Sequence, residues 1–191
     1  GTIGLITYLR TDSTRVSETA EVQVKEFIES KYGDSYMAKE INSKKSNKKI
    51  QDAHEAIRPT DVNLMPEEVK DQLPRDLFRL YQLIWRRFVA SRMENSVYET
   101  TNVKVNAGKY IFNASTSKLD FDGFMKVYTD SDNEKVVTNN TIAKLEKDSK
   151  LEFEKFEENQ HFTQPPAHFT EAALVKAMEE QGIGRPSTYA P

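Results

Sequence analysis

The sequence contains no cysteine, which excludes disulfide bonds and metal sites made of thiolates. This absence fits an intracellular protein without proving that location. No apolar run approaches the roughly 18 residues that a membrane-spanning helix needs. An excess of positive charge is absent too, because the 191 residues carry a formal net charge of −3. Any affinity for nucleic acid must therefore come from local basic residues or from partners outside this chain.

The residues that are present predict a globular protein of the α+β class. The length of 191 residues allows one large domain or two small ones, and 37% of the residues are hydrophobic. The period of the apolar residues changes along the chain and separates three domains. We expect a mainly helical domain over residues 1–95, an antiparallel β domain over 96–164 and the start of a helical domain over 165–191.

In the first region, the run IGLITYL over residues 3–9 is apolar and β-prone, so it predicts a short strand. Ser17 stands at the N-cap position of a predicted helix that stops at Gly33. The apolar residues of that helix recur at helical spacing, which predicts that one face is buried. That face consists of Ala20, Val24, Phe27 and Ile28.

The rest of the first region alternates loops and helices. Residues 36–59 have no period and carry several lysines, which predicts a long mobile loop. A short helix is expected after Pro66, and Pro74 is expected in the first turn of a longer helix. The longer helix has an apolar stripe, with Arg86 and Arg87 toward its flank. The stripe consists of Leu77, Leu80, Tyr81, Ile84, Trp85 and Phe88.

The second region changes to a period of two residues, which is typical of strands. A hairpin is predicted with its turn at residues 106–108, and further strands are predicted over 121–128 and 150–159. Together they predict an antiparallel β unit with one solvated face.

The third region begins at the adjacent prolines Pro165 and Pro166, which form a stiff break. Thr170 is expected to cap a helix that Gly182 ends. The segment that follows is the turn Gly-Arg-Pro-Ser-Thr over residues 184–188.

Tyr8 and Arg10 lie two residues apart in the first predicted strand, so we expect both side chains on the same side of it. A phenol in water ionises near pH 10, and only about 0.1% is the nucleophilic phenolate at neutral pH. A guanidinium beside the phenol favours the phenolate and can also bind a phosphate oxygen. The pair suits reversible cleavage of nucleic acid, because a phosphotyrosine ester can be resealed without ATP. The same pattern also arises from a half-buried tyrosine beside a solvated arginine.

Three motifs occur in the order GLITYLRTDSTRVS, QDAHEAIRPTDV and FTEAALVKAMEEQGIGRPSTYA. Together they resemble the motifs of bacterial type IA DNA topoisomerase I. The resemblance covers nearly the whole chain and is weaker across the β region. It implies that Tyr8 is the nucleophile that attacks one DNA strand and keeps the 5′ phosphate as a covalent ester. It also implies that Arg10 orients the scissile phosphate and stabilises the charge that grows on it.

The second motif implies two further residues near the active site. His54 is expected to donate a hydrogen bond to a phosphate or to carry a proton, and we place it with Tyr8 and Arg10 in the catalytic set. Arg58 is expected to bind DNA. Glu55 is left out of the catalytic set, because it could instead pair with Arg58 or Lys49. A histidine that merely packs is the alternative interpretation of His54.

The third motif implies a site for single-stranded DNA near the cleavage point. Arg185, Ser187 and Thr188 match the block that the family uses there, and their donors suit phosphate oxygens. The alternative interpretation is an ordinary turn that ends a helix and carries a conventional arginine.

The resemblance also implies the setting of this chain in a ring of four domains. Residues 1–95 would belong to the gate domain that carries the tyrosine, 96–164 to the arch that lets the gate move, and 165–191 to the base of the ring. Mg²⁺ would be held by a separate acidic domain outside this chain, and none by the chain itself. The implied whole enzyme is a cytoplasmic, nucleoid-associated monomer that acts on single-stranded segments of negatively supercoiled DNA, without a membrane. The chain alone is expected to be inactive in relaxation.

Two other classes of protein stay open at the level of sequence. One is a noncatalytic nucleic-acid-binding module. The other is a different enzyme that forms phosphotyrosine, such as a rolling-circle nickase or a tyrosine recombinase. Nickases usually need a histidine pair for metal, and recombinases need several basic residues around the tyrosine; neither set is visible in the sequence.

Overall fold

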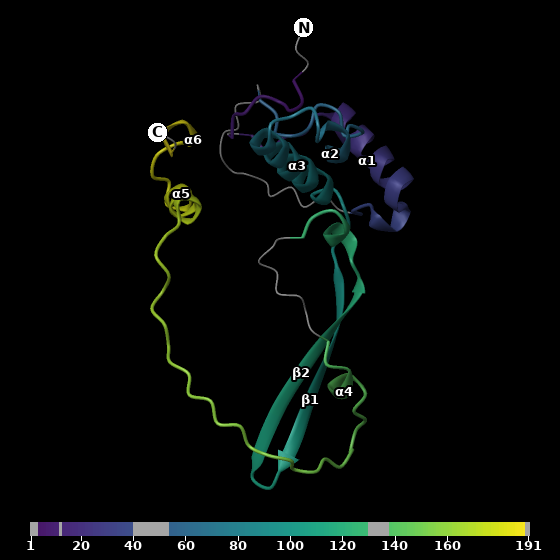
Figure 1. Cartoon of the computed structure of the whole chain (residues 1–191), viewed down its shortest axis with the longest axis vertical. Helices are drawn as coiled ribbons and strands as arrows, with labels where there is room; N and C mark the ends of the chain where they lie inside the picture. Colours follow the sequence, from purple (N-terminus) through teal and green to yellow (C-terminus); the bar gives the residue numbers. More distant parts are fainter. Residues whose placement is uncertain (1–3, 12, 40–53, 130–137, 190–191) are drawn as a thin grey trace. The chain divides into compact units, whose positions relative to one another are not determined.

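The computed structural model describes residues 4–11, 13–39, 54–129 and 138–189, except the side chains of Pro186 and Ser187 (Figure 1). The chain divides into two compact units, Gly1–Leu145 and Glu146–Pro191. Helices and a two-stranded antiparallel sheet are both present, which confirms the predicted α+β class. The predicted domain limits after residues 95 and 164 stay predictions.

The helical part of the first unit contains α1 (Glu18–Tyr32), η1 (Asp34–Tyr36), α2 (Pro66–Val69) and α3 (Arg75–Ala90). Its core joins the inner faces of α1 and α3, and the residues predicted to be buried in the first helix are all buried. Phe27 meets Trp85 edge to face, with ring centroids 5.6 Å apart, which is a favoured aromatic geometry. The indole N–H of Trp85 donates to the Val62 carbonyl at 2.9 Å, so its polar atom has a partner inside the core. Gly33 ends α1 as predicted, with a φ of 96°.

The apolar stripe of α3 is only partly buried. Tyr81, Trp85 and Phe88 are buried, whereas Leu77 is 54% and Leu80 44% exposed. The prediction of a helix is confirmed, but the prediction that one continuous stripe meets the core holds only for the C-terminal part of that stripe.

The strand predicted over residues 3–9 is wrong for the described residues of that run. A single antiparallel bridge joins Ile6 to Pro59, and the residues that flank it exchange backbone hydrogen bonds of 2.9 and 3.0 Å. Proline is tolerated in this pair because the two opposed residues do not donate to each other. The pairing therefore stops at one bridge, and the segment is an anchored loop.

The backbone turns directly after this bridge. The N–H of Arg10 donates to the Tyr8 carbonyl at 2.9 Å, a bond that closes a three-residue turn around Leu9. The rule of alternating side chains therefore does not apply to Tyr8 and Arg10, and the expectation that they share one side of a strand loses its basis.

The loop predicted over residues 36–59 is described only at its ends. Met37 forms a bridge with Met93, and residues 54–59 are held by the N-terminal segment. Residues 40–53, which contain most of the lysines of this loop, lie outside the described part of the chain.

The predicted hairpin is confirmed and consists of β1 (Val97–Ala107) and β2 (Tyr110–Phe121). Its turn falls on Gly108 and Lys109, slightly later than predicted. Gly108 has a φ of 60°, which suits the first central position of a tight hairpin turn. Both faces of this ribbon are largely exposed, and Thr116 is its one buried residue. One face is partly covered in the middle of the ribbon, at Thr101, Val103, Ala114 and Thr116, so the expected contrast between a covered and a solvated face holds only there.

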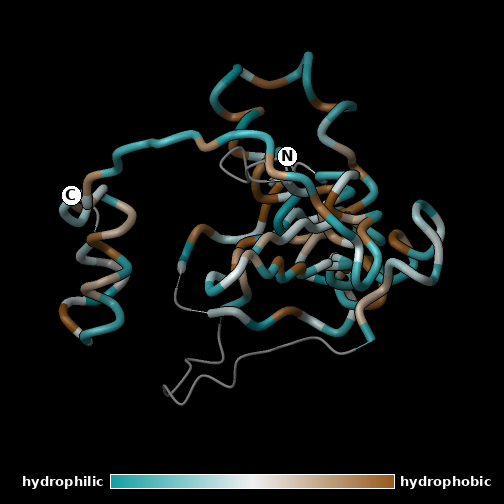
Figure 2. The backbone as a smooth tube through the Cα atoms, turned by 90° about the horizontal axis from the view of Figure 1, so that it is seen from below, coloured by the Kyte–Doolittle hydropathy of each residue, from teal (hydrophilic) through white to brown (hydrophobic). Residues whose placement is uncertain are grey.

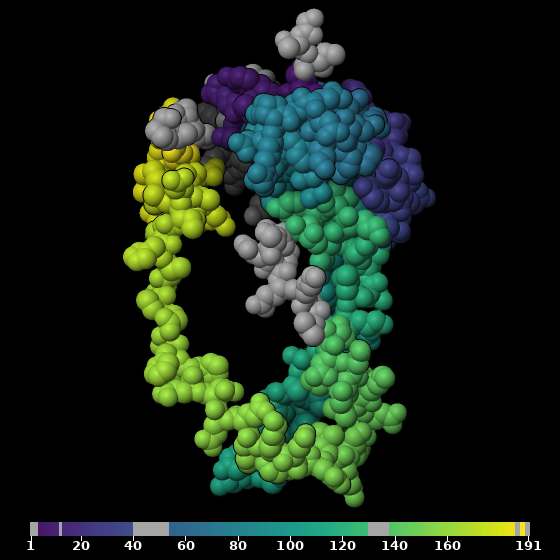
Figure 3. Space-filling view, viewed as in Figure 1, coloured from purple at the N-terminus to yellow at the C-terminus, as the bar shows by residue number. Residues whose placement is uncertain are grey.

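The two further strands predicted in the second region are also wrong. Residues 123–126 form a short helix, η2 (Gly123–Lys126), and the N–H of Phe124 in it donates to the Glu94 carbonyl at 2.8 Å. A side chain at Gly123 would put its Cβ 2.5 Å from the Glu94 carbonyl oxygen, so only glycine fits there. Residues 149–170 have no regular secondary structure, and Figure 3 shows this extended segment in yellow-green. An alternating pattern forms a strand only where a partner strand is available.

The second unit ends in α5 (Glu171–Glu180) and α6 (Pro186–Tyr189). The Thr170 hydroxyl accepts a hydrogen bond from the Ala173 N–H at 3.2 Å, which confirms the predicted cap. At the other end Gly182 has a φ of 71°, and the N–H of Ile183 donates to the Met178 carbonyl at 2.8 Å. These features form a Schellman ending. Figure 2 shows α5, near the label C, with apolar and polar residues in turn along it.

The first unit also contains the short helix α4 (Asn140–Ala143), capped by the Asn139 side chain. In the described part of the chain, no helix is long and apolar enough to cross a membrane.

Candidate active site

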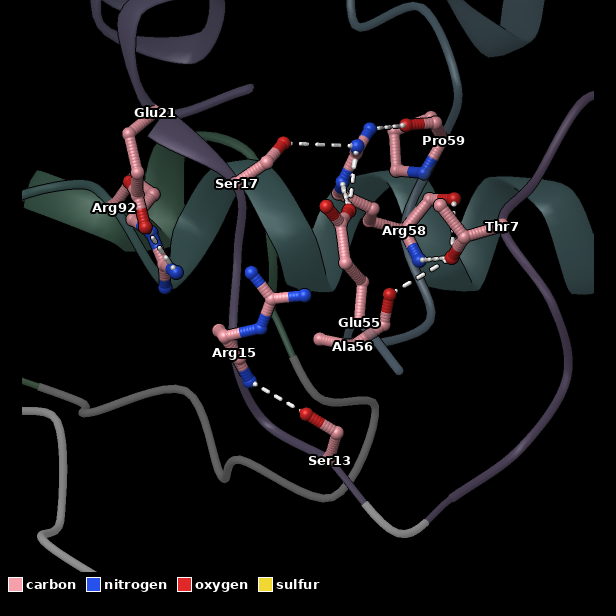
Figure 4. A network of polar contacts seen from close by, with 10 residues as sticks. All are labelled: Thr7, Ser13, Arg15, Ser17, Glu21, Glu55, Ala56, Arg58, Pro59 and Arg92. Carbon is pink, nitrogen blue, oxygen red and sulfur yellow. Dashed lines mark hydrogen bonds and ion pairs between the residues drawn. The ribbon is translucent and has the colours of Figure 1, made fainter. Parts of the chain in front are cut away.

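The first two sequence motifs lie side by side in the first unit. Besides the single bridge, the Thr7 hydroxyl donates to the Ala56 carbonyl at 2.8 Å and accepts from the Arg58 N–H at 2.9 Å. Figure 4 shows Thr7 reaching both backbone groups. Farther along, the Ala56 N–H donates to the Arg15 carbonyl at 2.7 Å. The segment that follows His54 and the segment around Tyr8 are thus joined by hydrogen bonds.

This pairing brings Tyr8 and His54 together. Their ring centroids are 5.9 Å apart and their planes are inclined by 30°. The Tyr8 side chain is 73% exposed, so its phenol is open to a large substrate. His54 is half-buried, and its Nδ1 atom is buried. The arrangement offers an accessible nucleophile next to a group that can exchange protons.

Arg10 is exposed and follows the tight turn after Tyr8. Because the two residues are separated only by Leu9, both lie at the same exposed corner of the chain. The catalytic roles of Tyr8, Arg10 and His54 stay predictions.

Arg58 is held inside the protein by Glu55. Its Nε and Nη2 atoms donate to one carboxylate oxygen of Glu55 at 3.0 and 2.7 Å, and its Nη1 donates to the Pro59 carbonyl at 2.9 Å. The side chain of Arg58 is only 12% exposed. The pairing predicted as one option for Glu55 is confirmed, and the binding of DNA by Arg58 stays a prediction.

Burial alone would raise the pKa of Glu55, but its neighbours outweigh burial and lower that pKa. The largest of these opposing effects are the hydrogen bond and the charge of Arg58, and Ser17 and Arg15 add to them. Figure 4 shows the side chains of Arg15 and Arg58 around this carboxylate. The carboxylate therefore stays ionised at neutral pH and keeps Arg58 in place.

Two polar contacts of the first unit, one made by Ser17 and one by Arg92, were not predicted from the sequence. Ser17 occupies the N-cap position of α1, but its side chain does not cap the helix. Its hydroxyl instead accepts from Nη2 of Arg58 at 3.4 Å. Arg92 makes a second, two-pronged ion pair with Glu21, with a shortest N–O distance of 2.8 Å. Neither pair has a local sequence signal, because the partners of each lie far apart in the chain.

An apolar groove lies beside Tyr8. Its volume is about 530 Å³, and it includes Leu9 together with Leu80 and Leu83 of α3. All three leucines are more than 40% exposed, with Leu9 at 61%. Leu80 and Ile84 of the α3 stripe line this groove, whereas Leu77 lies outside it.

The third motif lies in the second unit. The Thr188 hydroxyl donates to the Arg185 carbonyl at 2.9 Å and accepts from the Arg185 N–H at 3.0 Å, so it closes its own turn. Gly184 has a φ of 75°, which favours glycine, and a Cβ there would lie 2.9 Å from the ring of Tyr189. Arg185 is exposed, and the side chain of Ser187 lies outside the described part. Binding of DNA by these residues stays a prediction.

Within the described residues, no group of three or more histidine, aspartate or glutamate side chains could hold a metal ion. These described residues therefore do not form a site for Mg²⁺.

Comparison with known proteins decides the family. A family model described as DNA topoisomerase matches residues 2–191. This chain belongs to the DNA topoisomerase family. It is also similar to a solved structure, that of full-length topoisomerase I from Thermotoga maritima, with 38% sequence identity and a TM-score of 0.72. The match covers 98% of this chain and 29% of the Thermotoga protein. The resemblance to bacterial type IA topoisomerase I is thereby confirmed.

Proposed function

We propose that the protein carrying this chain cleaves one strand of DNA through Tyr8, passes another strand through the break and rejoins the ends. The observation that carries this proposal is the exposed phenol of Tyr8, whose ring lies 5.9 Å from that of His54 in a chain of the DNA topoisomerase family. Relaxation of negatively supercoiled DNA is the resulting activity.

The chemical step is an exchange of esters. The phenolic oxygen of Tyr8 bonds to the phosphorus and loses its proton, while the 3′ oxygen of the broken strand leaves and gains one. The 5′ phosphate then remains on Tyr8. Because one phosphodiester replaces another, the 3′ hydroxyl can reverse the step without ATP.

Arg10 and His54 assist this exchange. The exposed guanidinium of Arg10 stabilises the negative charge that builds on the phosphoryl oxygens. His54 donates a hydrogen bond or transfers a proton, because an imidazole can do both near neutral pH.

The remaining features of the proposal concern the whole enzyme. Its substrate is a single-stranded segment of negatively supercoiled DNA, which Arg58, Arg185, Ser187 and Thr188 help to bind. The enzyme acts as a cytoplasmic monomer and uses Mg²⁺ bound outside this chain. The chain alone does not relax DNA, since it corresponds to 29% of its Thermotoga relative.

The test uses the full-length protein and a single-stranded oligonucleotide labelled at its 3′ end, so that the label stays with the 5′ phosphate. Denaturation should trap a labelled protein adduct, which Tyr8→Phe abolishes and Arg10→Ala forms far more slowly. An adduct that persists in Tyr8→Phe would exclude Tyr8 as the nucleophile. Binding of the oligonucleotide without any adduct would favour the noncatalytic binding module.

A further inference from the structure

Thr7 makes more hydrogen bonds to the second motif than any other described residue of the segment before Tyr8. Its hydroxyl donates to the Ala56 carbonyl at 2.8 Å and accepts from the Arg58 N–H at 2.9 Å. Its own N–H donates to the Arg58 carbonyl at 2.9 Å. The donor and acceptor capacities of the hydroxyl are thus both used on backbone atoms.

The position of Thr7 gives these bonds a consequence for the active site. Tyr8 is the next residue, and His54 lies two residues before Ala56. The side chain of Tyr8 is 73% exposed, so packing does little to fix it. The bonds of Thr7 therefore connect the residue before Tyr8 to the chain two and four residues after His54.

A regular sheet does not supply this restraint. The pairing between the two segments is a single bridge at Ile6 and Pro59, and the chain turns away after Tyr8. In a regular sheet, backbone groups of the facing strand would bond to the Ala56 carbonyl and the Arg58 N–H. Here the Thr7 hydroxyl bonds to both groups instead.

We propose that Thr7 is a positioning residue, whose hydroxyl sets the place of the Tyr8 phenol relative to His54 for strand cleavage. This inference rests on the proposed function of Tyr8. Loss of the hydroxyl leaves the N–H of Arg58 and the carbonyl of Ala56 without this partner, so the two segments can shift against each other. A displacement of about 1 Å in a reacting group can slow a reaction by about 100-fold.

The chain offers a matched control in Thr60. Its hydroxyl donates to the Gly4 carbonyl at 2.8 Å, so it joins the same two segments on the other side of the Ile6–Pro59 bridge. Thr60→Val removes one hydroxyl bond across the same pairing but leaves the contacts of Thr7 in place.

The experiment measures the single-turnover rate of adduct formation, the affinity for the oligonucleotide and the melting temperature in the full-length protein. Thr7→Val should cleave about 100-fold more slowly, with unchanged affinity for DNA. Thr7→Ser, which keeps the hydroxyl, and Thr60→Val should both cleave at close to the wild-type rate. A purely structural role would instead lower the melting temperature of Thr7→Val without this selective loss of rate.

Several results would overturn the inference. They are a wild-type rate in Thr7→Val, an equal loss in folded Thr7→Ser, an equal loss in Thr60→Val, or a loss of DNA affinity in place of rate. If Thr7→Val does not fold, Thr7→Ser is compared with Thr7→Cys, because a thiol bonds more weakly than a hydroxyl. Equal rates in that pair would then refute the role of the hydroxyl. The proposed function fails separately, and this inference with it, if Tyr8→Phe still forms the adduct.

Discussion

The helical part of the first unit and the hairpin that follows it bury their residues to very different degrees. The helices α1 and α3 each bury four side chains, whereas the strands β1 and β2 together bury only Thr116. A helix satisfies its backbone internally and needs one neighbour for its apolar stripe. A two-stranded ribbon keeps open edges and faces, and it is marginally stable alone. The candidate site therefore lies on the well-packed helical part, and the ribbon contributes little to the stability of that part.

The largest expected effect contrasts a packed aromatic residue with an exposed one. Trp85→Ala should lower the free energy of unfolding by about 3–5 kcal/mol, because it empties the centre of the core. Phe153 is 70% exposed, so Phe153→Ala should change that energy by less than about 0.5 kcal/mol. Denaturation in urea measures both. A comparable loss in Phe153→Ala would show that the second unit has a core of its own.

The next effect concerns the ion pair between Glu55 and Arg58 within the second motif. Glu55→Gln should cost about 1.5–3 kcal/mol at neutral pH, because the largely buried Arg58 loses a charged partner. The pKa of Glu55 is lowered from 4.5, so this stabilisation is complete above that pH and is lost as the pH falls through the folded-state pKa.

The difference in unfolding free energy between wild type and Glu55→Gln should therefore shrink below about pH 4.5. Unfolding curves at a series of pH values measure it, with Glu26→Gln, an exposed position on α1, as the control. A difference that is constant down to pH 3 would contradict the assignment of the ion pair.

A smaller effect is expected at Tyr81, which donates to the Leu64 carbonyl at 2.6 Å. Tyr81→Phe should cost about 1 kcal/mol. Burial raises the pKa of the Tyr81 phenol from 10.0 to about 12, and the charges of Asp61 and Glu68 contribute. The stabilisation is complete below pH 10 and is lost as the pH rises toward 12. Wild type should thus lose stability more steeply than Tyr81→Phe over that interval, and parallel curves would refute this.

The smallest effect is expected outside the packed core. Thr170→Ala removes the cap of α5 and should cost about 0.5 kcal/mol of helix stability, the low end of the range for caps. The change in helical content is measured by far-ultraviolet circular dichroism. Thr170→Ser should retain the helical signal of the wild type. An unchanged signal in Thr170→Ala would show that the cap does not stabilise this helix.

The sequence predicted best the features that depend on neighbouring residues. The buried face of α1, the glycine stop at Gly33 and the cap at Thr170 are all confirmed, because a helix and its ends are decided within a few residues. The strands predicted over residues 3–9 and 150–159 are wrong, because an alternating pattern does not reveal whether a partner strand exists. The contacts of Thr7 and Ser17 with Arg58 could not be predicted, since they form only after distant segments meet.

The most direct test of the account is to identify the residue that carries the DNA. The adduct formed by the full-length protein is trapped, digested with nuclease and protease, and sequenced by mass spectrometry. We predict that the peptide containing Tyr8 carries a nucleotide joined through its 5′ phosphate to the tyrosine oxygen. A nucleotide on any other residue, with the peptide of Tyr8 unmodified, would contradict the account.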